Sequence, residues 1–251
     1  MALSSISSTD NIYYFRHRSR RRFFALVRFL IVFYIVYQIV TVMLISSYTI
    51  GSGSMRPVLR PGDRVLVCPL VFGSPVPFTQ LRLPAVRPPK RGDIVIVRPA
   101  YYRPDPWYAA IAGPVIRFFS VQHASLGSDS RGEPGNSAVA ARVVGLPGDT
   151  VRVQDDVVYV EPKGTASFSS ELELSRKPYD PSRPSLPEGW NGNLPFSGRV
   201  PDVTLGPHSY FLVGDNRAAS NDSIEWGPVS EGNIVGKVIF RYWPLNVLNV
   251  L

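Results

Sequence analysis

The sequence is poor in the residues that bind metals, form disulfides or act as bases. Its 251 residues include one cysteine, three histidines and only four lysines. A single cysteine, Cys68, excludes an intramolecular disulfide framework and any all-cysteine metal site. We expect Cys68 to pack as a small apolar residue at the end of a strand over residues 64–67. Neither a cofactor nor a metal is expected.

A basic surface that could follow nucleic acid is also lacking. The formal net charge is +8, but residues 1–28 hold six arginines against one aspartate, Asp10. Most of the surplus therefore flanks the apolar run that follows, which is typical of a membrane-topology signal and not of a phosphate-binding groove. Interleaved aromatic and basic residues, which bind single strands, are not apparent elsewhere. No nucleic-acid partner is expected.

One long apolar run is present. Residues 29–45 carry no charge, and together with residues 23–27 they provide about 20–23 residues, enough to cross a hydrocarbon core of about 30 Å. A cleaved signal peptide is the alternative. Its apolar region would span about 7–15 residues, and residues 46–50 offer only a weak cleavage site. The run therefore favours an uncleaved anchor in the lipid bilayer.

The arginines lie only on the N-terminal side of this run. The positive-inside rule then predicts a cytoplasmic basic tail at 1–22, a transmembrane anchor at 23–47 and an extracytoplasmic domain at 48–251. The predicted location is the plasma (inner) membrane, which the chain crosses once.

The exterior part has the pattern of a mainly β domain. Short runs rich in valine and isoleucine alternate with turn signals, and no long amphipathic helical period is visible. This favours a coiled sheet or barrel-like architecture. The expected strands cover residues 64–67, 93–97, 142–144, 150–154, 157–161, 209–213 and 235–242.

Two stretches do not fit that sheet. Residues 163–205 are rich in proline, serine and glycine, which indicates a variable excursion or a small subdomain. Residues 100–136 form an insertion that contains the apolar segment 107–122. That segment is too short and too interrupted for a second span, so we expect it either to lie in the membrane interface or to pack in the core.

Ser54 is the most informative residue of the chain. It lies in the sequence Gly-Ser-Gly-Ser-Met-Arg-Pro over residues 51–57, a few residues after the apolar run. A hydroxyl on a glycine-loosened turn just outside a membrane could attack a peptide bond held near the membrane surface.

Four sequence blocks support this interpretation when they are taken together. The blocks are residues 51–63 (GSGSMRPVLRPGD), 90–97 (KRGDIVIV), 142–149 (RVVGLPGD) and 214–223 (GDNRAASNDS). Their order, behind an apolar anchor, is similar to that of the type I (leader) signal peptidases, membrane-anchored peptidases with a serine–lysine dyad. Each block alone is a weak signal, because Gly-Asp pairs are common in turns.

The resemblance implies a largely β fold and a role for particular residues. Ser54 matches the nucleophile, and the Ser52 hydroxyl matches a donor that joins the Ser54 backbone N–H in the oxyanion hole. Ser220 matches a serine that orients the ammonium of the lysine. The remaining matches are Asp215 and Arg142 as a structural ion pair, with Arg217 and Asp222 in the supporting loop.

The chain departs from the family pattern at the general base. The lysine of the family stands immediately before the arginine of the third block, where this sequence has Ala141. Ile224 also stands where bacterial members often have an arginine partner for Asp222. A serine hydroxyl needs a base near neutral pH.

No replacement base is evident, since each remaining candidate is more readily explained as a surface or structural residue. His17 lies on the predicted cytoplasmic side, and His208 precedes a strand. The other candidates are Lys90, Lys163, Lys177, Lys237 and His123.

Two functions remain open. The chain is either a signal peptidase I-like serine endopeptidase, with a displaced base or one supplied by a partner, or a catalytically impaired relative that binds signal peptides as an accessory subunit. The expected partners are signal peptides of exported preproteins, the lipid bilayer, and a paralogous or accessory subunit. An unrelated membrane-anchored β domain is the third reading.

Overall fold

The computed structural model describes residues 8–39, 44–73, 83–99, 138–154, 156–175, 179–183 and 200–250. The chain divides into two compact units, Met1–Thr41 and Val42–Leu251. The predicted insertion at 100–136, with its apolar segment 107–122, lies outside the described residues. So do Lys177 and His123.

The first unit contains one helix, α1 (Ser8–Ile39), of 32 residues. Among the helices that the structure describes, none combines the length and the apolar character that crossing a membrane requires. The helix starts earlier than the predicted anchor. The anchor was expected to extend to residue 47, but Ser46–Thr49 instead form strand β1, because they pair with the strand that follows.

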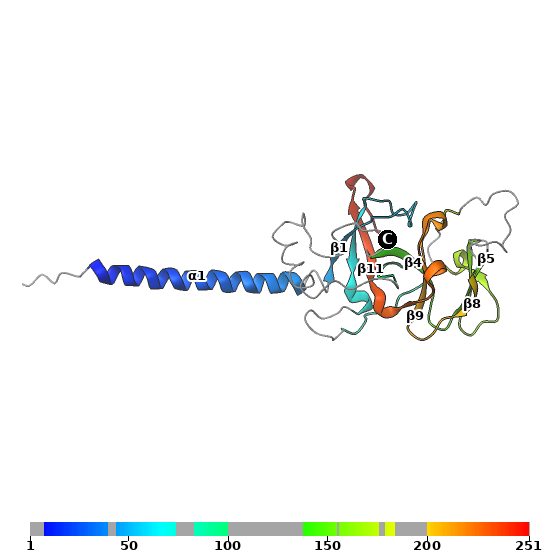
Figure 1. Cartoon of the computed structure of the whole chain (residues 1–251), viewed down its shortest axis with the longest axis horizontal. Coiled ribbons are helices and arrows are strands. Elements are labelled where there is room, and N and C mark those ends of the chain that lie inside the picture. Colours follow the sequence, from blue (N-terminus) through cyan, green and yellow to red (C-terminus); the bar gives the residue numbers. More distant parts are fainter. Residues whose placement is uncertain are drawn as a thin grey trace, which may run out of the picture. The chain divides into compact units, whose positions relative to one another are not determined.

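The second unit is built on a large antiparallel sheet (Figure 1). Its strands follow the order β1-β2-β11-β3-β4-β9-β10, and β12 pairs with β11. Every strand predicted here from the sequence is present, whereas β1, β10 and β12 were not predicted. The strands are β1 (Ser46–Thr49), β2 (Arg64–Cys68), β3 (Ile94–Val97), β4 (Val139–Gly145), β9 (Ser209–Val213), β10 (Val229–Ser230), β11 (Ile234–Trp243) and β12 (Asn249–Val250).

A second sheet of four strands has the order β7-β6-β5-β8. The hairpin β5 (Thr150–Gln154) and β6 (Val157–Glu161) was predicted. The other two strands, β7 (Ser169–Ser170) and β8 (Val200–Thr204), come from the stretch 163–205. That stretch therefore supplies the outer strands of a small sheet, which fits a small subdomain better than an irregular excursion.

Short helices occupy the connections of this unit. In the described part of the unit, α-helical turns are α3 (Glu171–Leu174) and α4 (Ser223–Trp226). Helices of the 3-10 type cover Pro69–Phe72, Arg217–Ala219, Glu231–Asn233 and Leu245–Val247.

The Gly-Asp pairs of the first three sequence blocks build one repeated turn. Gly62, Gly92 and Gly148 have φ angles of 91°, 86° and 88°, as type II turns require at their third position. The carboxylate of the aspartate that follows each glycine accepts a hydrogen bond from the backbone N–H three residues earlier. These donors are Arg60, Lys90 and Leu146 respectively. Each turn leads directly into a strand, so these pairs place β2, β3 and β5.

Each of these carboxylates also binds a cation from a distant segment. Arg241 pairs with Asp63 at 3.1 Å, Lys237 with Asp93 at 2.9 Å, and Arg91 with Asp149 at 2.5 Å. The turns are therefore fixed to the sheet by charge as well as by the backbone.

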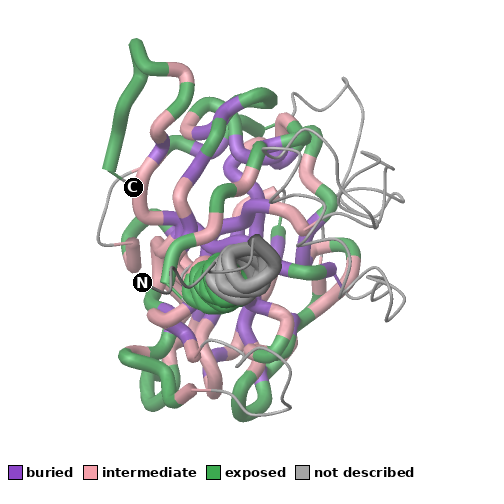
Figure 2. The backbone as a smooth tube through the Cα atoms, turned by 90° about the vertical axis from the view of Figure 1, so that its left-hand side faces the viewer, coloured by how far each residue is buried: buried purple, intermediate pink, exposed green. Residues whose placement is uncertain are grey.

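The core of the second unit follows the two sheets. Figure 2 shows the buried residues gathered towards the middle of this unit and exposed residues around its outside. One cluster joins both sheets, because Val144, Phe211 and Val213 of the large sheet pack with Val151 and Val158 of the small one. Gly145 lies at this junction, where an added methyl would come within 2.9 Å of Leu205, Phe211 and Val151. The cluster fixes the small sheet against the strands that carry the site.

Candidate active site

The turn with Ser54 is anchored by the apolar residues that follow it. Met55 and Leu59 are fully buried, and the Leu59 N–H donates to the Met55 carbonyl. Ser54 is itself 7% exposed, whereas Ser52 lies at the surface. The two hydroxyl oxygens, Oγ of Ser52 and Oγ of Ser54, are 2.8 Å apart. The structure thus brings the predicted nucleophile and the predicted oxyanion donor into hydrogen-bond contact.

The loop after β9 holds this turn from the other side. The Asn216 N–H donates to the Ser54 carbonyl at 2.8 Å, and the Asn216 side-chain amide donates to the Gly53 carbonyl at 3.1 Å. Gly214 is part of the same contact, since a methyl there would lie 2.2 Å from Ser220 Oγ and 2.6 Å from the Ser54 carbonyl oxygen. The Ser54 carbonyl and the Ser220 hydroxyl therefore both lie against Gly214, which leaves no room for a side chain there.

Asp222 lies behind Ser220 and is buried. Its carboxylate accepts hydrogen bonds from the Ser220 hydroxyl, from the Gly214 N–H at 2.8 Å and from the Ile224 N–H at 2.9 Å. The last contact caps helix α4. Backbone donors thus take the place of the arginine that the resemblance predicts at position 224. Because the Ser220 hydroxyl donates its hydrogen bond to Asp222, its oxygen can accept hydrogen bonds from other donors.

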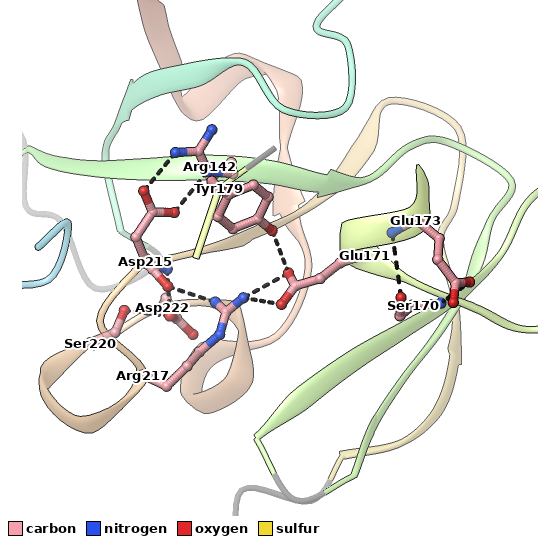
Figure 3. Close-up of polar contacts among 10 residues, drawn as sticks. Arg142, Ser170, Glu171, Glu173, Tyr179, Asp215, Arg217, Ser220 and Asp222 are labelled. Carbon is pink, nitrogen blue, oxygen red and sulfur yellow. Dashed lines mark hydrogen bonds and ion pairs between the residues drawn. The ribbon is translucent and has the colours of Figure 1, made fainter. Parts of the chain in front are cut away.

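Arg142 and Asp215, which the resemblance pairs, form a bidentate ion pair (Figure 3). The two N···O distances are 2.7 and 2.6 Å, and both side chains are at most 5% exposed. A third nitrogen of Arg142 donates to the Gly92 carbonyl at 3.1 Å. The pair therefore ties β4 to the loop that follows β9.

Arg217 forms a second buried ion pair, with Glu171 of α3. The Arg217 Nη2 atom lies 2.5 and 2.6 Å from the two Glu171 carboxylate oxygens, and Nη1 donates to the Gly214 carbonyl at 2.6 Å. Burial opposes the charge of Arg217, but the Glu171 carboxylate outweighs it and raises the pKa of the guanidinium. Sequence reasoning found Arg217 and missed Glu171, because no local pattern links residues 46 positions apart.

Tyr179 connects the two ion pairs. Its hydroxyl donates to Glu171 Oε2 at 2.8 Å, and its ring lies 4.1 Å from the Arg142 guanidinium carbon. Burial and the neighbouring Glu171 charge raise the pKa of the Tyr179 hydroxyl. It therefore stays protonated and acts as a donor. Sequence reasoning missed this residue as well.

Ala141, at the position where the resemblance predicts the general-base lysine, is 1% exposed. It pairs with Val95 of β3, and it lies one residue before Arg142, whose partner on β9 is Val213. Ala141 and Gly214 thus flank the Arg142–Val213 pair at the same end of the ladder between β4 and β9. The neighbours of Ala141 in the buried cluster are apolar and include Val95, Val143 and Leu212.

The described candidates for a displaced base are engaged or placed elsewhere. Lys237 binds Asp93 at 2.9 Å, and His208 binds Glu231 at 2.7 Å. Lys90 and Lys163 are exposed. The hydrogen bond that the structure gives the Ser54 hydroxyl is the one to Ser52. Within the described ranges, no group of acidic, histidine and cysteine side chains could hold a metal ion.

Comparison with known families agrees with this geometry. A family model described as signal peptidase, peptidase S26, matches residues 23–243. Since the match covers most of the chain, the chain belongs to this family, which confirms the resemblance drawn from the four sequence blocks.

Individual relatives have the same kind of name. Signal peptidase I of Pseudomonas fluorescens is 29% identical over 220 residues, covering 80% of this chain and 66% of the relative, just under two thirds of its length. Signal peptidase IB of Staphylococcus aureus is 27% identical over 215 residues and covers 85% of both chains. A crystal structure of a signal peptidase I from Enterococcus faecalis aligns with a TM-score of 0.30 at 22% identity, covering 61% of this chain and 99% of that one.

Proposed function

We propose that the chain is a signal peptidase I-like serine endopeptidase that removes N-terminal signal peptides from exported preproteins. The observation that carries the proposal is the contact of 2.8 Å between the Ser52 and Ser54 hydroxyls, on a turn held by Asn216 beside Ser220. A nucleophile with an adjacent donor is the arrangement that acyl transfer requires.

In this proposal Ser54 Oγ attacks the carbonyl carbon of the peptide bond to be cut and gives its proton to a base that is displaced from position 141 or supplied by a partner chain. The same base then protonates the leaving amine as the C–N bond breaks, and water hydrolyses the acyl-enzyme that remains. The negative charge that develops on the carbonyl oxygen is stabilised by the Ser52 hydroxyl and by the Ser54 backbone N–H, and each such donor contributes about 3–4 kcal/mol to the transition state. Arg142, Asp215 and Arg217 keep the loop at residues 214–222 in place. Ser220 and Asp222 line the side of the site where the family has its base.

The substrate would enter as an additional strand. The ladder between β4 and β9 begins at Arg142, so among the described strands the edge of Val139–Ala141 that faces away from β3 has no partner. An extended peptide can pair with such an edge through its backbone, while its alternate side chains select the sequence. Membership of the signal peptidase family favours a peptide with small residues at the first and third positions before the cut.

Anchoring in the plasma membrane is part of the proposal. It rests on the apolar residues 23–45 and on the arginines that precede them. Protease added to the outside of spheroplasts should digest the chain after about residue 50 and leave the N-terminal tail intact. If only the tail is digested, the proposed orientation is wrong.

A second candidate function is favoured by Ala141. With alanine at the base position, and with the described lysines exposed or engaged, the chain could bind signal peptides without cutting them and act as an accessory subunit. The cleft would then still recognise a preprotein, but a paralogous subunit would supply the catalysis.

The test is cleavage of a preprotein by the purified full-length chain, with Ser54→Ala as the control. The endopeptidase proposal expects cleavage after an Ala-x-Ala sequence, loss of cleavage in Ser54→Ala, and loss with bulky residues at both alanine positions. Binding of the Ala-x-Ala preprotein without cleavage supports the accessory function. If the chain neither binds nor cleaves the preprotein, both candidate functions are wrong.

A further inference from the structure

A short segment of the stretch 163–205 lies along the loop that carries the site. The Ser182 N–H donates to the Asp215 carbonyl at 2.8 Å, and the Arg217 N–H donates to the Ser182 carbonyl at 2.8 Å. Ser182 and Asn216 thus form a parallel bridge. The backbone of the loop is therefore held from outside by a segment that sequence reasoning treated as variable.

The same loop residue, Asn216, holds the nucleophile on its opposite side. Its backbone N–H and its side-chain amide donate to the carbonyls of Ser54 and Gly53. A displacement of Asn216 would move these two carbonyls, and with them the Ser54 side chain. The position of the hydroxyl consequently depends on how firmly the loop is held at Ser182.

Glu171 holds the loop at a second point. It is 3% exposed and places both carboxylate oxygens on Arg217, which in turn donates to the Gly214 carbonyl. Gly214 is the residue at which Ser54 and Ser220 meet. Nη2 of Arg217 contacts both carboxylate oxygens of Glu171, while Nη1 donates to Gly214. Because charge-assisted hydrogen bonds between buried groups are short and strong, the carboxylate of Glu171 fixes Arg217, and Arg217 fixes the start of the loop.

Tyr179 joins this contact to the ion pair on β4. Figure 3 shows its hydroxyl directed at Glu171 while its ring lies beside Arg142. Glu173, on the same helical turn as Glu171, is directed away from the network and accepts from the Ser170 N–H at 3.2 Å. Glu173 is therefore a matched residue for comparison.

We propose that Glu171 and Tyr179 are positioning residues for Ser54. They act through Arg217 and the loop 214–217, and they do not touch the reacting atoms. The proposal rests on the proposed function, because it concerns the geometry of the nucleophile in that reaction. It assigns the segment around α3 a part in catalysis.

The test compares Glu171→Gln with Glu173→Gln in the full-length chain, below the melting transition of either variant. Amide hydrogen exchange would be measured at Asn216 and Arg217, whose N–H groups make the bonds described above, and at Val143 in the core of the large sheet. Glu171→Gln should raise exchange at Asn216 and Arg217 by at least about tenfold and leave Val143 unchanged. Glu173→Gln should change none of the three.

Preprotein cleavage gives the second measurement, made in the wild-type background or, if that is inactive, with Ala141→Lys. Glu171→Gln should lower kcat by about 10- to 100-fold without changing KM, because a displaced nucleophile affects the chemical step. Tyr179→Phe keeps the ring over Arg142 and should retain more activity than Tyr179→Leu.

Three results would overturn the proposal: equal exchange in the two glutamate variants, unchanged exchange at Asn216 in Glu171→Gln, or an unchanged kcat in an active background. If neither background cleaves any preprotein, the proposed function fails in its enzymatic form. The exchange at Asn216 then still decides whether Glu171 holds the loop.

Discussion

Ala141 and Arg142 are adjacent on β4, yet they face opposite sides of the sheet and very different surroundings. Arg142 forms an ion pair with Asp215 and lies over the ring of Tyr179. The Tyr179 hydroxyl donates to Glu171, which in turn forms an ion pair with Arg217. Ala141 faces an apolar cluster beside Gly214, where the family has its base.

The difference separates two requirements of a serine peptidase site. Holding the nucleophile in place is a matter of buried contacts, and on the Arg142 side two buried ion pairs provide them. Taking the proton from the nucleophile requires a titratable group, and position 141 does not supply one. The scaffold of the site therefore does not depend on a base at position 141, and the two sides can be tested separately.

The largest effect on stability is expected from the Arg142 side. Asp215→Ala would leave the Arg142 charge buried without its partner, which costs about 3–5 kcal/mol, so the melting temperature should fall sharply. Asp202→Ala is the matched control, since it removes the exposed partner of Arg152 and should change the melting temperature little. Circular dichroism of the two variants would measure both. Equal melting temperatures would show that the Arg142 network does not support the fold.

An intermediate effect is expected where the two sides meet. Gly214→Ala would place a methyl 2.2 Å from Ser220 Oγ and 2.6 Å from the backbone carbonyl of Ser54, and the overpacking should cost about 1–3 kcal/mol. Because both serines must move, preprotein cleavage should fall more than stability does. Gly51→Ala is the control, since a methyl there meets nothing within 4 Å. Urea unfolding and cleavage rates would be compared, and a Gly214→Ala variant that matches Gly51→Ala in both would disprove the contact.

The smallest effect concerns Lys237, which the structure places with Asp93 and not at the base position. Burial opposes ionisation of Asp93, but hydrogen bonds from Arg87 and Lys237 outweigh it and hold the pKa of the carboxyl below its ordinary value. As the pH falls, the Asp93 carboxylate is therefore protonated at a higher pH in the unfolded chain than in the folded chain. The stabilisation, about 1 kcal/mol or less, is fully present at neutral pH and is lost below about pH 4.

Asp93→Asn should therefore lower the free energy of unfolding at pH 7 and make little difference near pH 3, as measured by urea titration at each pH. Cleavage at pH 7 should remain as in the wild type. A large change in cleavage would instead assign Lys237 a catalytic part and weaken the contrast between the two sides of β4.

Much of this scaffold could be predicted from the sequence, because its signals are local. Valine- and isoleucine-rich runs indicated the strands of the large sheet, and the Gly-Asp turns marked where β2, β3 and β5 begin. Short strands such as β10 and β12 lack such a signal, since two residues carry no recognisable alternation. The strand β8 was missed because its sequence, Val-Pro-Asp-Val-Thr, contains a proline that argues against a strand.

The site divides in the same way. Ser52, Ser54, Arg142, Asp215, Arg217, Ser220 and Asp222 could be named from motif order, and the structure brings them together around one loop. Glu171 and Tyr179 could not be named, since their partners lie far along the chain and their role arises only when the small sheet packs against the large one. The sequence shows alanine at position 141 directly. Only the structure shows that this alanine is buried among apolar side chains.

The measurement that tests the account most directly is preprotein cleavage by Ala141→Lys, alongside the wild-type chain, Ala141→Met and Ala141→Lys with Ser54→Ala. A lysine in this apolar position should have a lowered pKa and accept the Ser54 proton. If no other base acts in the wild type, Ala141→Lys should cleave up to about 10²–10⁴ times faster, Ala141→Met should gain nothing, and the Ser54→Ala combination should be inactive. If a displaced base already acts, Ala141→Lys should cleave no faster than the wild type. A folded but inactive Ala141→Lys variant would contradict the claim that the site lacks only its base.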